Sequence, residues 1–344
     1  CKFDPFSPIL DQKVNPKMQE EGRKKLGENF GSSGELEKAD EIPVEDVKEV
    51  VIVNRNAIDI DFNQSRIAKL ENLENLPNVE TLCFRQNLIK KIEGVASLTT
   101  LTELDLYDNQ LEHIENLETL VNLEVLDLSF NRIKVIQGIE SLSKIKKLYL
   151  VNNKIEKIEG IGSQTELEML ELGANRIRVL ENLDHLTKLR SLFIGKNKIT
   201  KLEGLDKLVH LQCLSIQSNR ILKLEGLGNL VHLDELYISH NGIEVIEGLD
   251  GNTELTTVDL ANNRIKKIEN ISHIKELAEF WFNDNQIDSW NEIDHLQGLP
   301  NLETVYMERN PIYYGEDGKI CPDYRRKIIL ALPKLKQLDA TLLR

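Results

Sequence analysis

One asparagine returns every 22 residues through the centre of this chain, and this spacing limits the available folds more than any other feature. The ten positions are Asn87, Asn109, Asn131, Asn153, Asn175, Asn197, Asn219, Asn241, Asn263 and Asn285. A fixed period of about 20 to 50 residues is typical of solenoids, in which each unit buries its apolar face only against its neighbours. The period therefore overrides the expectation of two or three domains for 344 residues and predicts one elongated domain.

The residues around each asparagine predict the shape of one coil. Leu104 and Leu106 flank one polar residue, which is typical of a short strand with two side chains facing the core. The amide of Asn109 can then bond backbone groups of its own and adjacent coils. Apolar residues at every third position after it suit 3₁₀ turns. This is the pattern of leucine-rich repeats, which implies an α/β solenoid, a horseshoe of 22-residue coils with a parallel concave sheet and 3₁₀ turns on the convex side.

Recurring Glu-Gly and Glu-Asn dipeptides mark a second turn within the coil. Examples are Glu93-Gly94, Glu115-Asn116, Glu159-Gly160 and Glu247-Gly248. Glycine and asparagine tolerate positive φ better than other residues, so we expect a left-handed backbone conformation there.

Both ends of the chain depart from the period and set the predicted boundaries. Residues 1–41 contain scattered prolines and no apolar period, which predicts a disordered leader. We place the leucine-rich-repeat domain at 42–344, with an N-terminal cap at 42–64, repeats at 65–309 and a C-terminal cap at 310–344. The N-terminal cap is predicted to contain a strand at Val50–Val53, and Ser65 stands in the register of the asparagines. A helix is predicted from Asn310 to Pro333, where it would cover the apolar interior of the last coil.

Composition narrows the class of function. The formal net charge of −14 disfavours nucleic acid or an anionic membrane as the main partner. Four widely separated cysteines predict neither a zinc site nor a disulfide framework, and no apolar run is long enough to span a bilayer. The motifs of hydrolases, metalloproteases and nucleotide-binding loops are missing from the sequence. We therefore predict a protein that is not an enzyme and needs no cofactor or metal.

The centre of each predicted strand, four residues before the asparagine, points out of the concave face. This column reads Cys83, Asp105, Asp127, Tyr149, Glu171, Phe193, Ser215, Tyr237, Asp259, Trp281 and Tyr306. Five of these are aromatic in a chain that is only 5% aromatic, and four are acidic. An exposed apolar row lowers solubility unless something covers it, which favours a protein-binding stripe. The alternative is that the aromatic rings pack on one another across adjacent strands.

Six segments of the chain resemble the leucine-rich-repeat regulatory subunits of protein phosphatase 1. They are LCFRQNLIK (82–90), LDLYDN (104–109), SHNGIEVIEGL (239–249), NRIKKIENISH (263–273), FWFNDN (280–285) and RRKIILALP (325–333). The resemblance covers about residues 42–344, and residues 1–41 do not match the acidic leader expected of that family. It implies a noncatalytic subunit that binds the phosphatase catalytic subunit through the concave face and controls its activity, maturation or location.

The same resemblance implies particular contact residues and further partners. The implied partner-binding positions are Asp127, Tyr149, Glu171, Phe193, Asp259, Glu279, Trp281 and Tyr306. Tyr149 stands where the family is expected to have Phe, a change that keeps the ring. The resemblance also implies a ternary complex with a second phosphatase inhibitor, and residence in the nucleus and cytoplasm.

Two other classes of protein-binding scaffold remain open from the sequence. One is an RNA-protein adaptor, which RNA-dependent copurification would identify. The other is an extracellular adhesion repeat protein or receptor ectodomain, which a glycan at Asn63 or Asn270 would support, because both asparagines begin an N-x-S sequon.

Overall fold

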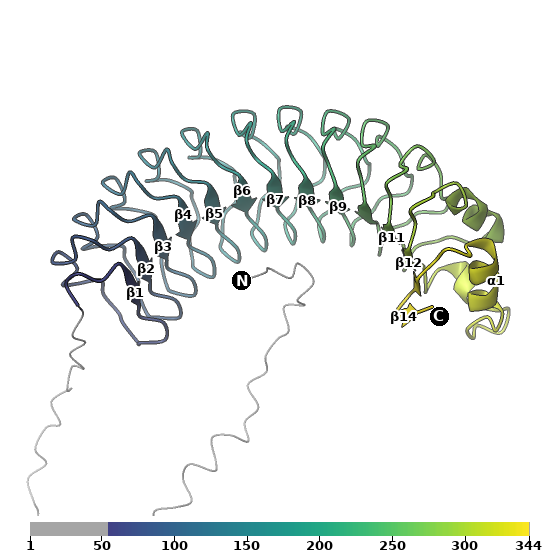
Figure 1. Ribbon diagram of the computed structural model, residues 1–344, viewed down its shortest axis with the longest axis horizontal. Helices are drawn as coiled ribbons and strands as arrows, with labels where there is room; N and C mark the ends of the chain where they lie inside the picture. Colours follow the sequence, from purple (N-terminus) through teal and green to yellow (C-terminus); the bar gives the residue numbers. More distant parts are fainter. Residues whose placement is uncertain (1–53, 344) are drawn as a thin grey trace, which may run out of the picture. The chain divides into compact units, whose positions relative to one another are not determined.

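The computed structural model describes residues 54–343, which form a continuous solenoid of short strands (Figure 1). The parallel strands are Asp59–Asp61 (β1), Thr81–Cys83 (β2), Glu103–Asp105 (β3), Val125–Asp127 (β4), Lys147–Tyr149 (β5), Met169–Glu171 (β6), Ser191–Phe193 (β7), Cys213–Ser215 (β8), Glu235–Tyr237 (β9), Thr257–Asp259 (β10), Glu279–Trp281 (β11), Thr304–Tyr306 (β12) and Gln337–Leu338 (β13). Thr341–Leu342 (β14) pairs antiparallel with β13 and completes one sheet in strict chain order. The predicted leader and the predicted strand at Val50–Val53 lie outside the described residues.

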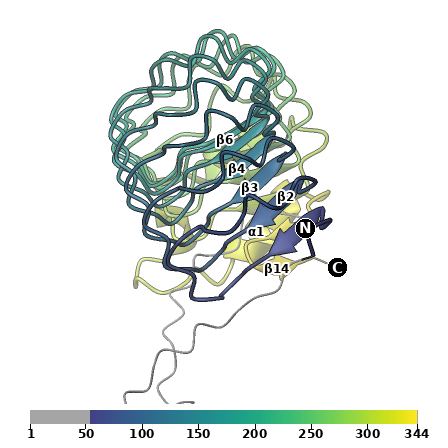
Figure 2. The same cartoon turned by 90° about the vertical axis from the view of Figure 1, so that its left-hand side faces the viewer.

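The strands all lie on the same side of the solenoid, with the connecting loops on the other sides (Figure 2). The middle residue of each parallel strand from β1 to β12 is buried, as Leu104 is in β3, and its two neighbours are less buried in most strands. The predicted α/β solenoid with a parallel concave sheet is therefore confirmed. Its core is a continuous column of leucine and isoleucine that each coil shares with the next.

Buried asparagines join the coils in a hydrogen-bonded ladder. Asn109 Oδ1 accepts a bond from Ile89 N of the preceding coil (3.0 Å), while Asn109 Nδ2 donates to Phe84 O (2.8 Å). The same amide also donates to Leu106 O of its own coil (3.1 Å). This pattern continues to Asn310, so the predicted ladder is confirmed. Ser65, in the same register, instead donates to the carbonyl of Asn63 in its own coil (3.3 Å).

The convex side consists mainly of short turns closed by bonds from the amide of residue i+3 to the carbonyl of residue i. Examples are Leu98 N to Val95 O and Leu120 N to Leu117 O, both 2.9 Å. A continuous 3₁₀ helix forms where the coil after Asn285 is lengthened, at Trp290–Leu296 (η2). The predicted 3₁₀-type turns therefore occur, but most coils hold two successive turns rather than a continuous helix, as where Leu101 N also donates to Leu98 O (3.1 Å).

The Glu-Gly and Glu-Asn turns adopt positive φ as predicted, and the structure explains why either glycine or asparagine occupies the second position of each turn. Gly94 has φ +72°, and a Cβ at this position would lie 2.7 Å from the carbonyl oxygen of Leu70 in the preceding coil. Asn116 has φ 61°, and its Nδ2 donates to the corresponding carbonyl of Ile92 (2.6 Å). Glycine thus avoids the crowded carbonyl, whereas asparagine satisfies it with a hydrogen bond.

The C-terminal cap is helical over a shorter range than predicted. The α-helix spans Tyr324–Ala331 (α1), and only a three-residue 3₁₀ turn, Pro311–Tyr313 (η3), follows Asn310. The prediction of a helix through 310–323 is wrong because Gly315 and Gly318 place a tight turn there, closed by Gly315 N to Lys319 O (2.8 Å). The helix α1 packs against the last coil through buried Tyr324 and Ile328, as a cap requires.

Beyond the last asparagine of the ladder, the side chain of Asp339 accepts the corresponding backbone hydrogen bonds. Its Oδ1 accepts bonds from the backbone nitrogens of Met307 and Glu308, both at 3.0 Å, and its Oδ2 accepts one from Tyr324 Oη (3.1 Å). A single buried carboxylate therefore holds β12, α1 and the C-terminal strands together.

We expect Asn175→Ala to lower the stability of the solenoid by at least about 2 kcal/mol, because Ile155 N, Leu150 O and Leu172 O would lose their buried partner. Urea denaturation followed by circular dichroism measures the change. Among residues 54–343, the exposed amide of Asn229 bonds to the Asp206 side chain alone (3.3 Å), so Asn229→Ala is the matched control and should shift the midpoint little. Equal shifts for the two variants would contradict the ladder's role.

At the C-terminal end, we expect Asp339→Ala to destabilise the cap by about 2 to 3 kcal/mol, because two backbone donors and one phenol lose a buried acceptor. Asp339→Asn retains one acceptor oxygen and should lose less. Limited proteolysis at α1 measures opening of the cap. Cleavage of the alanine variant at the wild-type rate would refute this assignment.

Candidate functional site

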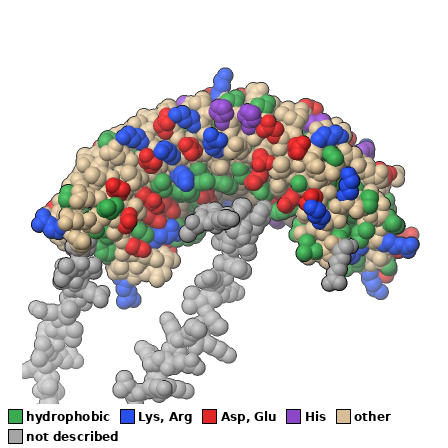
Figure 3. Space-filling view, in the orientation of Figure 1, with side chains coloured by type: hydrophobic (Ala, Val, Ile, Leu, Met, Phe, Trp, Pro, Cys, Tyr) green, Lys and Arg blue, Asp and Glu red, His purple; other side chains and the backbone are tan. Residues whose placement is uncertain are grey.

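The strand register brings the predicted concave column into one continuous row. Asp127 pairs with Tyr149, Tyr149 with Glu171, and Glu171 with Phe193. The same register continues from Asp259 to Trp281 and from Trp281 to Tyr306. We call these residues, from Cys83 to Tyr306, the concave row. Figure 3 shows acidic and hydrophobic side chains next to one another along the inner margin of the solenoid.

The concave row is less exposed than its sequence pattern predicts. Tyr237 is only 4% exposed and Asp259 only 6%, and the other members are half-buried. The aromatic residues Phe193, Trp281 and Tyr306 are therefore partly exposed, whereas Tyr237 and Asp259 are buried. Neighbouring parallel strands lie about 4.8 Å apart, so large side chains of one strand cover those of the next.

An aromatic cluster occupies the C-terminal end of the row. The ring centroids of Tyr237 and Trp281 are 6.4 Å apart across the intervening strand of Asp259, and those of Trp281 and Tyr306 are 5.4 Å apart. Ring packing across strands, the alternative raised from the sequence, thus occurs at this end. Gln337 Nε2 also donates to Tyr306 Oη (2.6 Å). Glu279, the other predicted contact residue here, precedes Trp281 on β11 by two positions.

The aspartates of the row hold their own strands in place. Asp105 Oδ1 accepts from Tyr107 N (3.0 Å), Asp127 Oδ1 from Ser129 N (2.8 Å) and Asp259 Oδ1 from Ala261 N (3.0 Å). One oxygen of each carboxylate is therefore used to cap a backbone nitrogen. The acidic character of the row has a structural component as well as any role in binding.

Burial shifts the acid–base properties of the middle of the row. Desolvation by burial, and secondarily the charge of Asp127, raises the pKa of Glu171 from 4.5 to about 7. Burial also raises the pKa of Asp127 and of Asp259. Tyr149 lies in register between Asp127 and Glu171, and its own pKa is raised by burial and then by Glu171. A partner that supplies a positive charge here would restore the charged form of Glu171.

Arg85 reaches into the row from its edge. Its Nη1 lies 2.8 Å from Asp105 Oδ2 and 3.6 Å from Asp127 Oδ2, and its guanidinium carbon lies 4.0 Å from the centroid of the Tyr107 ring. Arg85 and Tyr107 each stand two residues before a ladder asparagine, in the column beside the concave row. An arginine side chain is long enough to reach the neighbouring column, and the repeat pattern alone did not reveal this contact.

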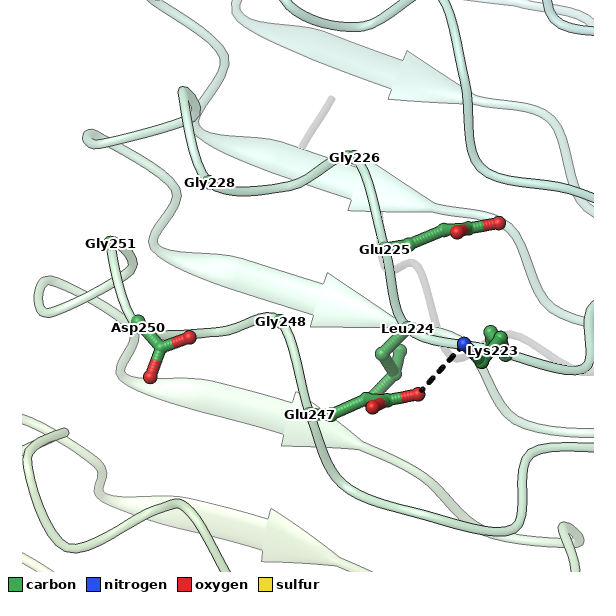
Figure 4. A pocket seen from close by; sticks show the side chains of 9 residues that line it. All are labelled: Lys223, Leu224, Glu225, Gly226, Gly228, Glu247, Gly248, Asp250 and Gly251. Carbon is green, nitrogen blue, oxygen red and sulfur yellow. Dashed lines mark ion pairs between the residues drawn. The ribbon is translucent and has the colours of Figure 1, made fainter.

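The described residues contain neither a cluster of metal-ligating side chains nor a membrane-spanning helix, and they form an open groove. No group of three or more His, Cys, Asp or Glu side chains in residues 54–343 could hold a metal ion. Across that same range, every helix is too short or too polar to pass through a bilayer. One open groove of about 350 Å³ lies between two coils (Figure 4), where Lys223 Nζ and Glu247 Oε1 are 3.8 Å apart beside Gly226 and Gly248. It includes no residue of the concave row.

Comparison with known families identifies the repeats. A sequence profile described as "Leucine Rich repeats (2 copies)" matches residues 77–120, 121–163, 165–207 and 231–273, together about half of the chain. A solved internalin from Listeria monocytogenes superposes with a TM-score of 0.67 over 83% of this chain and 87% of that one, at 23% identity. At this identity the likeness concerns the fold alone.

Curated relatives give a more specific but shorter match. "Protein phosphatase 1 regulatory subunit 7" of Homo sapiens is 57% identical over 58 residues, which is 17% of this chain and 14% of the relative. The protein of the same name from Bos taurus is 58% identical over 58 residues, with the same coverage. These matches confirm the resemblance over that segment. The chain spans only about one seventh of the length of these relatives in the matched part.

We expect the buried Glu171 to make stability depend on pH. Its folded-state pKa of about 7 exceeds 4.5, so folding favours the protonated form. The stabilisation is fully present below about pH 4.5 and is lost as pH rises through about 7. Between about pH 5 and about pH 8, the free energy of unfolding of Glu171→Gln should therefore increase relative to that of the wild type by up to about 3 kcal/mol.

Urea titrations of both proteins at the two pH values measure this difference. Glu118→Gln, at an exposed site outside the concave row, is the matched control that removes one carboxylate from solvent. A constant difference in unfolding free energy between Glu171→Gln and the wild type at both pH values would contradict the burial argument.

Proposed function

Because this chain belongs to the leucine-rich-repeat family, we propose that it is a noncatalytic regulatory subunit that binds the catalytic subunit of protein phosphatase 1 through the concave row. It would control the activity, maturation or location of that enzyme. The single observation that carries the proposal is the row itself, which aligns aromatic and acidic side chains in register on eight of the nine strands from β4 to β12, with Ser215 on the remaining one. The named similarity to a phosphatase 1 regulatory subunit supplies the identity of the partner.

The aromatic cluster supports a preorganised binding surface. Trp281 and Tyr306 are held by ring packing and by the hydrogen bond from Gln337 before any partner arrives. Side chains fixed in this way lose little conformational entropy on binding. Tryptophan and tyrosine in half-buried positions are also the residues that most often dominate interface energies.

The size of the row supports a globular partner rather than a short peptide. From β4 to β12 the sheet is about 40 Å long at about 4.8 Å per strand. This length allows simultaneous contact at Asp127, Tyr149, Glu171 and Phe193 near the middle, and at Asp259, Glu279, Trp281 and Tyr306 near the C-terminal end. Since Asp127 and Asp259 each cap a backbone nitrogen, Glu171 and Glu279 are the acids that we expect to contact basic groups of the phosphatase.

The location and the additional partners that the resemblance implies belong to the same proposal. We place the protein in the nucleus and cytoplasm with the phosphatase. Because the row lies on one face of the solenoid, a second phosphatase inhibitor could join a ternary complex without displacing this subunit. Neither nucleic acid nor a membrane is part of the proposed assembly.

The extracellular alternative is less compatible with the structure at one of its two sequons. Asn270 Nδ2 donates to Ile246 O of the preceding coil (2.7 Å). A glycan on that nitrogen would compete with this inter-coil bond. The RNA-protein adaptor is separated from the proposed function by testing whether ribonuclease removes the captured partner.

We expect Trp281→Ala and Glu279→Ala each to weaken binding of the purified phosphatase 1 catalytic subunit by at least about 2 kcal/mol, as for residues at the centre of an interface. Isothermal titration calorimetry measures the affinity. The control is Glu254→Ala, which removes an acidic side chain from another face. Circular dichroism must first show that each variant retains the fold. Wild-type affinity in both row variants would refute binding through the concave row.

A further inference from the structure

The loops that contain the ladder asparagine carry a strong positive charge in five consecutive coils. We call residues 130–135, 152–157, 174–179, 196–201 and 218–223 the basic ridge. Eleven of its residues are Lys or Arg and one, Glu156, is acidic, whereas the whole chain has a net charge of −14. The position directly after the asparagine is basic in all five coils, as Arg132, Lys154, Arg176, Lys198 and Arg220.

Stacking of the coils concentrates this charge on one edge of the solenoid. Equivalent residues of adjacent coils lie about 5 Å apart, and like charges at that spacing repel one another. Arg132, Arg176 and Arg220 are exposed, and Lys154 and Lys198 are half-buried. The ridge begins past the carboxyl ends of the strands, so it is distinct from the concave row.

Few carboxylates neutralise the ridge. Within residues 54–343, its ion pairs are Arg176 to Glu156 at 3.9 Å, Lys201 to Glu203 at 3.2 Å and Lys223 to Glu247 at 3.8 Å. The remaining basic residues of the ridge have no ion pair with a described carboxylate. An external anionic group would relieve the repulsion along the ridge.

Apolar side chains are interleaved with the charges. Val135 is 42% exposed, Val179 is 44% exposed and Leu222 is 60% exposed, and each lies in one of the five ridge loops. A ligand that matches this surface must offer apolar groups as well as negative charge. An acidic segment of a protein meets both conditions.

Nucleic acid and anionic lipid fit the same surface less well. The one aromatic residue of the ridge is Phe130, whose ring already packs on Tyr107 at 4.8 Å, so the ridge has no stacking platform for bases. Two residues past the ridge, successive coils carry Glu159, Glu181, Glu203 and Glu225. This parallel acidic column would repel an extended polyanion that covered the whole edge.

We propose that the basic ridge is a second interaction surface, which binds an acidic protein segment whose Asp and Glu side chains alternate with apolar ones. The acidic groups would contact the basic column at Arg132 to Arg220, and the apolar ones would cover Val135, Val179 and Leu222. Binding here does not depend on what occupies the concave row.

The test uses the full chain and a short fluorescein-labelled peptide in which Glu and Asp alternate with Leu and Val. Fluorescence anisotropy gives its affinity at about 50 mM and about 200 mM NaCl. We expect Arg132→Glu/Arg176→Glu/Arg220→Glu to bind at least about tenfold more weakly, and wild-type affinity to fall at the higher salt concentration. Lys144→Glu/Lys207→Glu/Lys275→Glu changes the net charge equally at exposed sites outside the ridge and should stay within about twofold of the wild type.

The following results would overturn the proposal. If the wild type does not bind the peptide, the ridge is only a solvent-exposed surface. If both triple variants lose the same affinity for the peptide, the effect depends on net charge and not on the ridge. Tighter, ridge-dependent binding of a labelled single-stranded oligonucleotide or of phosphatidylserine vesicles assigns the surface to another class of partner. Trp281→Ala/Tyr306→Ala should keep wild-type peptide affinity, so failure of the ridge and failure of the concave row are distinguishable.

Discussion

The hydrogen bonds of the buried asparagines are the constraint on which the rest of the structure depends. Each amide links its own coil to the one before it, so the coils cannot slide relative to one another without leaving buried backbone groups unpaired. The ladder fixes the register of the strands in this way. It also holds the residue before each asparagine in a left-handed conformation, as at Asp108 (φ 53°) and Ala174 (φ 53°), where a residue other than glycine is strained by about 1 kcal/mol or more.

Because the strand register is fixed, residues at the same position of successive repeats lie side by side and form a continuous surface. Side chains at equivalent positions of successive coils become neighbours on the sheet, so Trp281 meets Tyr306 and Tyr149 lies between two carboxylates. Mutual packing explains how an apolar row can persist in water without a partner. It does not remove the row's capacity to bind, because half-buried rings still present an edge or a face that a partner can cover. The same stacking, applied to the next loops, concentrates the basic ridge on a neighbouring edge.

The features that repeat could be predicted from the sequence, and those that do not repeat could not. The asparagine period predicted the ladder, the sheet and the membership of the concave row, because each depends only on contacts between adjacent coils. The burial of Tyr237 and Asp259 escaped prediction because it depends on the size of the particular neighbours on either side. Asp339 has no periodic signal, since it contacts Met307 from 32 residues away. The start of helix α1 was missed because the cap follows its own turn chemistry at Gly315 and Gly318.

The most direct test of the proposed function is capture of protein phosphatase 1 from cytosol. The wild-type chain and Trp281→Ala/Tyr306→Ala would be immobilised in parallel, and the bound proteins identified by mass spectrometry and assayed for phosphatase activity. The account predicts that the wild type retains the catalytic subunit and that the double variant, folded by circular dichroism, does not. Equal retention by both chains would contradict binding through the concave row, and retention by neither would contradict the choice of partner.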